Sequence, residues 1–137
     1  MPSALLWGLV AIGIFASVLW LAFGVIVPGL VRRSWGRWHV AFPAVAPDPS
    51  GVTRRNQSFS VGLLNLGYGV HVVADASHLH LTPGALCRGF GLRPVSIPWG
   101  AVGIVGAFHF GRLRADIGGV RVIGPAWCLG MARGEDS

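Results

Sequence analysis

Hydrophobic and polar residues divide the chain into two parts with different patterns. From Ala4 to Val31 no side chain is charged over 28 consecutive positions. A helix of that length measures about 42 Å, close to the ~40–45 Å of a bilayer with its headgroup layers. Pro28 and Gly29 are expected to loosen its last turn. We therefore predict one transmembrane helix, within an anchor at residues 1–34.

The remainder of the chain has patterns typical of β-strands. Residues 41–58 are rich in proline and serine and include a DPSG turn signal, so we expect residues 35–58 to form a juxtamembrane segment and irregular linker. Apolar or alternating runs follow at 59–66, 70–74, 78–82, 94–97 and 101–110. The fold class predicted is α+β, mainly β. Residues 59–137 should form a small antiparallel sheet or partly open barrel that ends in a short helix at 125–132.

The clearest local prediction is a hairpin near the C-terminus. Two glycines at 118–119 suit a tight two-residue turn between alternating strands. Ile117 then lies opposite Val120, and Asp116 lies opposite Arg121 on the outward face. We expect a cross-strand ion pair there, worth a few tenths of a kcal/mol.

Composition supports the membrane assignment and limits the partners. Hydrophobic residues make up 53% and charged residues 12%, against roughly 25% charged in ordinary soluble domains. The net charge of +6 comes from arginine alone, since the chain has no lysine. These arginines are scattered rather than gathered on one face with aromatic residues, so we expect no nucleic-acid binding.

Arginines directly after the apolar run set the predicted orientation. The positive-inside rule places the N-terminus outside and the β domain in the cytoplasm. A cleaved signal peptide is the alternative, but "MPS" supplies no basic residue before the apolar run. The residues expected at the membrane interface are Trp7, Arg32, Arg33, Trp35, Arg37 and Trp38.

One group of histidines could be interpreted as part of a metal site. His78 and His80 lie two apart on a predicted strand and so on one face, with His71 and Asp75 nearby. No spacing specifies a third ligand. We favour solvated surface histidines and expect no metal.

The residues predict no catalytic centre and no cofactor. Cys87 and Cys128 lack a CxxC or histidine companion, which indicates free, partly buried thiols. The chain has no nucleophile elbow or paired carboxylates, and a P-loop needs a lysine. We expect a non-enzymatic protein.

Two segments, "VVADASHLHL" (72–81) and "CRGFGLRPVSIPW" (87–99), carry a family resemblance. Over residues 36–105 the chain resembles a group of short, mostly uncharacterised bacterial single-pass membrane proteins with a "GLYL…FR…HPP…IPW" core. Its most specific piece here is Ile97-Pro98-Trp99. The resemblance implies a pleckstrin-homology-like β fold without catalytic residues to transfer. His78 departs from the glycine usual in that group.

The function expected is that of an accessory, assembly or stabilising subunit of a larger membrane complex, with respiratory and photosynthetic hosts both open. Its partners would be other membrane-protein subunits, with unspecific attraction to anionic lipid headgroups. The alternative is a membrane-tethered module that senses an anionic lipid or small ligand. Its candidate ligand or partner contacts are Arg88, Arg93, Arg112 and Arg114.

Overall fold

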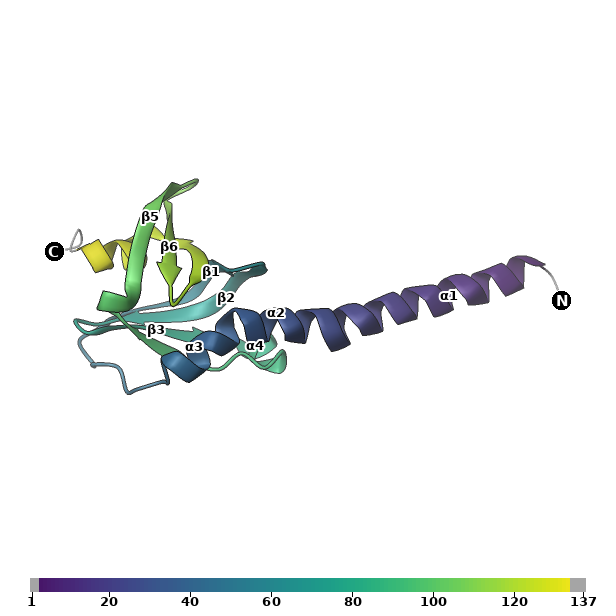
Figure 1. Cartoon of the computed structure of the whole chain (residues 1–137), viewed down its shortest axis with the longest axis horizontal. Coiled ribbons are helices and arrows are strands. Elements are labelled where there is room, and N and C mark those ends of the chain that lie inside the picture. Colours follow the sequence, from purple (N-terminus) through teal and green to yellow (C-terminus); the bar gives the residue numbers. More distant parts are fainter. Residues whose placement is uncertain (1–2, 134–137) are drawn as a thin grey trace.

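A long N-terminal helix projects from a β domain in the computed structural model, which describes residues 3–133 (Figure 1). The helix α1 (Ser3–Leu21) continues through the π-turn η1 (Ala22–Ile26) into α2 (Val27–Arg33). Pro28 has no N–H to donate, and just before it the Val27 N–H bonds the Ala22 carbonyl, five residues back. The continuous helix of 31 residues is long and apolar enough to cross a membrane. No residue of α1 is buried.

The next helix, α3 (Trp35–Ala41), corrects the prediction for two tryptophans. The side chains of Trp35 and Trp38 are 1% and 0% exposed, so neither indole can lie in the membrane interface. Three residues apart, they share the helix face that packs on the sheet. Their Nε1–H groups donate to the carbonyls of Arg93 (2.6 Å) and Ile117 (2.9 Å), which satisfies the polar end of each buried indole.

Seven antiparallel strands form one curled sheet, a half-barrel in the order β4-β3-β2-β1-β7-β6-β5 (Figure 1). This confirms the predicted class, α+β and mainly β, with a partly open barrel. The strands are β1 (Val52–Val61), β2 (Leu64–Ala74), β3 (His78–Pro83), β4 (Val95–Pro98), β5 (Val102–Phe108), β6 (Arg112–Ile117) and β7 (Val120–Pro125). The short helices are α4 (Ala85–Gly89), η2 (Trp99–Ala101), α5 (Ala126–Leu129) and η3 (Gly130–Arg133).

The first two strands differ from their predicted bounds. The strand β1 begins at Val52, inside the segment expected to be an irregular linker. Its first half is exposed and polar and has a bulge near Asn56, which has a φ of 54°, so no apolar alternation marks it. The turn between β1 and β2 lies at 62–63 rather than 67–69. Gly67, with a φ of 55°, provides a bulge that β2 runs through.

The C-terminal hairpin has the predicted register. Ile117 pairs with Val120 and Asp116 with Arg121. Gly118 and Gly119 have φ angles of 59° and 81°, which a two-residue turn of this kind requires. Instead of an ion pair with Arg121, the Asp116 carboxylate accepts the Gly119 N–H at 3.1 Å.

The Ile-Pro-Trp segment closes the edge of the sheet. Pro98 ends the edge strand β4, where its missing N–H costs no ladder bond. Trp99 packs against the core, and its Nε1–H donates to the Asp75 carbonyl at 2.8 Å. The segment therefore joins β4 to the turn between β2 and β3.

Candidate functional site

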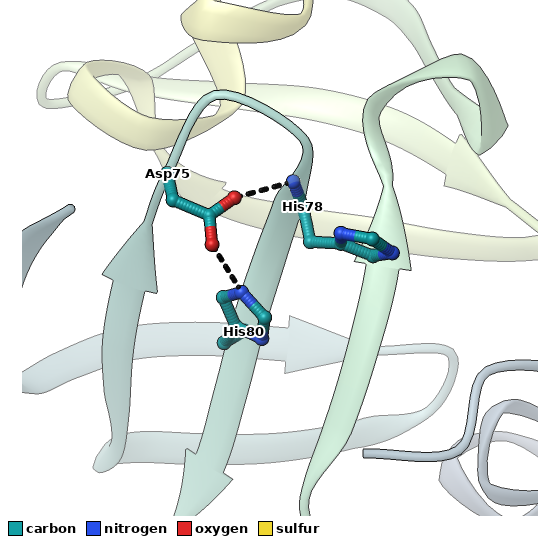
Figure 2. A group of neighbouring side chains, drawn as sticks. All are labelled: Asp75, His78 and His80. Carbon is teal, nitrogen blue, oxygen red and sulfur yellow. Dashed lines mark hydrogen bonds and ion pairs between the residues drawn. The ribbon is translucent and has the colours of Figure 1, made fainter. Parts of the chain in front are cut away.

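Three buried polar side chains form a chain of hydrogen bonds inside the domain. Asp75, His80 and Ser96 are 5%, 5% and 4% exposed. The His80 Nε2 lies 2.7 Å from Asp75 Oδ2 (Figure 2), and its Nδ1 lies 2.8 Å from Ser96 Oγ. Because an ionised carboxylate only accepts, Nε2 carries the proton and donates to Asp75.

The Asp75 carboxylate also organises the turn between β2 and β3. Its Oδ1 accepts the backbone N–H groups of Ser77 (2.9 Å) and His78 (2.7 Å), and its Oδ2 accepts that of Asp48 (3.0 Å). Burial acts to raise the pKa of this carboxyl, but the donated hydrogen bonds outweigh it and hold the pKa well below its usual range. The charged form is therefore the one that the fold stabilises.

Ser96 connects the same chain of bonds to the segment that follows α3. The Val45 N–H donates to Ser96 Oγ at 2.9 Å, and the Ser96 N–H donates to the Phe42 carbonyl at 3.2 Å. Pro43 forms a β-bridge with Val95 beside it. We call Asp75, His80 and Ser96 the closed network. Hydrogen bonds to Asp75 and Ser96 hold the segment 42–48 on the sheet at both ends.

The closed network contains the residue types of a Ser–His–Asp triad, but its arrangement is different. Serine hydrolases present histidine Nε2 to the serine and Nδ1 to the aspartate, whereas His80 does the reverse. The Ser96 oxygen is also covered by the Val45 backbone. The geometry supports a structural fastening rather than a nucleophile.

The histidine prediction needs correction at His80, which is buried rather than solvated. Ligand atoms of Asp75, His78 and His80 lie within 4.8 Å of one another, the spacing of a metal site. The atoms of Asp75 and His80 are engaged with each other, however, and the His78 ring points away from the carboxylate (Figure 2). His71 lies elsewhere and accepts the Asn56 N–H through Nδ1 at 3.1 Å.

A second group of polar side chains lies open to solvent where the long helix meets the sheet. Arg33 and Arg37, one turn apart on α2 and α3, face Arg121 of β7 across a cleft of about 210 Å³. The cleft is also lined by Leu30, Ser34, Gly62, Leu63, Gly119 and Val120. We call this surface the arginine cleft. The sequence prediction placed Arg33 and Arg37 at the membrane but missed Arg121, whose approach depends on the fold.

The four arginines predicted as ligand or partner contacts fall into two separate groups. Arg88 and Arg93 lie on and after α4, which packs on β2 and β3. Arg112 and Arg114 lie on β6, which three strands separate from β3 in the sheet order. Their guanidinium groups lie 5.0 and 5.6 Å from the ring centre of Phe108.

Both cysteines are free, as predicted, and both are buried rather than partly buried. Burial raises the pKa of the Cys87 thiol. Burial also raises the pKa of Cys128, to about 12, although backbone hydrogen bonds and Arg54 oppose it. Thiolates are therefore scarce near neutral pH, which suits packing rather than reactivity.

The fold and these sites define a class: an α+β protein with a long apolar N-terminal helix, in which the described buried polar side chains are hydrogen-bonded within the protein. Comparison with protein-family models, with curated proteins and with solved structures gives no match to this chain. Its function is therefore argued from its own surfaces.

Proposed function

We propose that the chain is a non-enzymatic, single-pass protein of the bacterial inner membrane, with its N-terminus outside and its β domain in the cytoplasm. It serves as an accessory, assembly or stabilising subunit of a larger membrane complex, with respiratory and photosynthetic hosts both open. Two features support anchoring. The apolar part of the helix Ser3–Arg33 is not buried against the described chain, and arginines lie in its last turn (Arg32, Arg33) and just beyond it (Arg37).

The hairpin tip between β5 and β6 is the observation that carries the docking role. Phe110 is 94% exposed and has a φ of 59°, an uncommon conformation for a phenylalanine. Together with the exposed ring of Tyr68 and with Arg112 it lines a hollow of about 320 Å³. Aromatic residues and arginine are the side chains enriched where protein partners bind.

The chemistry of this hairpin defines the partner. With Arg112 and Arg114 stacked on Phe108, the tip presents cations beside aromatic rings. A protein subunit with acidic side chains around an apolar pocket would complement both, and the net charge of +6 favours the same partner. Docking is preferred over ligand sensing because the four arginines proposed for sensing are not brought together.

Co-purification from the native membrane in mild detergent tests this role. We expect stoichiometric subunits to copurify with the wild-type chain, and Phe110→Ser with Arg112→Gln to lose at least tenfold of them, as for a hot spot. Val52→Ser, an exposed apolar residue at the start of β1, is the matched control and should retain them. A clean monomer at native abundance would refute the proposal.

A further inference from the structure

The arginine cleft has the features of an anion site. Arg33, Arg37 and Arg121 converge on it from α2, α3 and β7. We propose that it binds the phosphate of an anionic phospholipid in the leaflet that faces the β domain. This site is separate from the docking hairpin and does not depend on a protein partner.

The guanidinium groups of the cleft have hydrogen-bonding capacity to spare. Among residues 3–132, the one ion-pair contact joins His80 and Asp75, so no described acid neutralises these arginines. The neighbouring Asp116 carboxylate accepts the Gly119 N–H instead. Three cations that line one cleft repel one another, and a phosphate that accepts several N–H bonds relieves that repulsion.

The fold, rather than the sequence near the membrane, completes the cleft. The Gly62 N–H donates to the Arg121 carbonyl, which fixes the β1–β2 turn beside β7. Gly119 lies against the Arg37 guanidinium, since a Cβ built there would be 3.7 Å from its Nη2. Gly62 likewise lets the turn approach α2, because its Cβ would be 3.3 Å from the Ser34 Cβ. A flexible basic segment that attracts anionic lipids by charge alone would need none of these close contacts.

The position of the cleft favours a lipid phosphate over a soluble one. The uncharged positions 4–31 span about 42 Å, the thickness of a bilayer with its headgroups, so Arg33 lies at headgroup level. Leu30 and Leu63 line the same cleft, and Leu63 is 86% exposed. An exposed leucine beside arginines suits the boundary between acyl chains and headgroups.

A second contact brings the β domain beside the apolar helix. Phe90, just after α4, stacks on Phe23 of the long helix with ring centres 6.0 Å apart. Phe23 precedes Arg33 by ten residues, about 15 Å of helix toward the membrane interior. The exposed Leu86 of α4 lies in the same region, in the lining of a cleft with Phe23. Phe90 and Leu86 thus place apolar side chains of the β domain on the bilayer side of the arginine cleft.

Native mass spectrometry of the full chain in nanodiscs tests the proposal. The nanodiscs contain equal parts phosphatidylcholine and phosphatidylglycerol, and the readout is the ratio of the two lipids retained after release. Two variants lose the same charge: Arg33→Gln, Arg37→Gln and Arg121→Gln in the cleft, and Arg32→Gln, Arg54→Gln and Arg55→Gln outside it. A third carries Arg121→Gln alone.

We expect wild type and the outside variant to retain phosphatidylglycerol selectively. Arg121→Gln should lower that selectivity about fivefold, and the triple cleft variant should abolish it. Equal losses of phosphatidylglycerol selectivity in both triple variants would show that retention depends on unspecific charge attraction. That result would overturn the proposal. So would displacement of the retained lipid by millimolar inorganic phosphate, which would make the cleft a site for a soluble anion.

Discussion

The closed network and the arginine cleft are both polar, yet they differ in how their hydrogen bonds are completed. Every side chain of Asp75, His80 and Ser96 is buried and bonded within the protein. The cleft arginines are solvent-accessible, and the one arginine head among residues 3–132 that bonds a protein acceptor is Arg112, to the His109 carbonyl. Polar groups whose hydrogen bonds are completed within the protein stabilise the fold. Polar groups beside a cavity that lack protein partners are available to a ligand.

The largest expected effect breaks the closed network. Asp75→Ala leaves His80 and three backbone N–H groups without an acceptor, so we expect a loss of about 3–5 kcal/mol of unfolding free energy. Chemical unfolding of the full chain in an uncharged detergent measures it. His78→Ala, two residues from His80, should cost about 0.5 kcal/mol or less. Equal losses of unfolding free energy at both positions would show that the closed network does not stabilise the fold in this way.

A smaller effect is expected where α3 joins the sheet. Trp38→Phe keeps the apolar packing but leaves the buried Ile117 carbonyl without its donor. The loss should be about 1–2 kcal/mol. Trp7→Phe, the same substitution on exposed α1, should leave the unfolding of the β domain unchanged. An unchanged midpoint for Trp38→Phe would remove the reason to place this indole in the core.

Sequence patterns predicted the elements with strong periodicity and missed those set by long-range contacts. The long apolar helix and the hairpin at Gly118 and Gly119 follow from local residues alone. Trp35 and Trp38 follow a membrane span in the sequence, and only the tertiary packing of α3 shows that they are buried. His80 alternates like a surface residue, but its buried partner Ser96 lies 16 residues away.

The site was predictable only in part for the same reason. Arg33 and Arg37 were marked by their place after the span, while Arg121 reaches them through the pairing of β7 with β1. In the sequence, Asp75 is marked only as a neighbour of His78 and His80. Its role depends on the Asp48 N–H, which a segment without regular structure delivers.

Acid should weaken the closed network before it affects the cleft. The Asp75 carboxyl takes up its proton near the ordinary pKa of 3.8 when unfolded, and at a lower pH when folded. The unfolded state therefore binds more protons as pH falls from about 5, and stability decreases with decreasing pH in that window. Asp75→Asn should reduce the dependence of the unfolding free energy on pH in that window, and Asp48→Asn should keep most of that dependence. Equal slopes for wild type and Asp75→Asn would contradict the assignment.

The smallest effect is expected in the cleft. Without lipid, replacing Arg33, Arg37 and Arg121 with glutamine should change the unfolding free energy by about 0.5 kcal/mol or less, since these side chains hold no structural bonds. Unfolding in an uncharged detergent is the measurement. A loss of several kcal/mol of unfolding free energy would show that these arginines stabilise the fold.

The central claim is that the closed network stabilises the fold and the arginine cleft binds lipid. The melting temperature of the full chain in zwitterionic and in anionic nanodiscs tests this difference most directly. A ligand that binds only the folded state raises it. We predict that anionic lipid raises the melting temperature of wild type and of Asp75→Asn alike, although the latter starts lower. The triple cleft variant should start near wild type and gain nothing. An equal rise in the triple cleft variant would contradict the account.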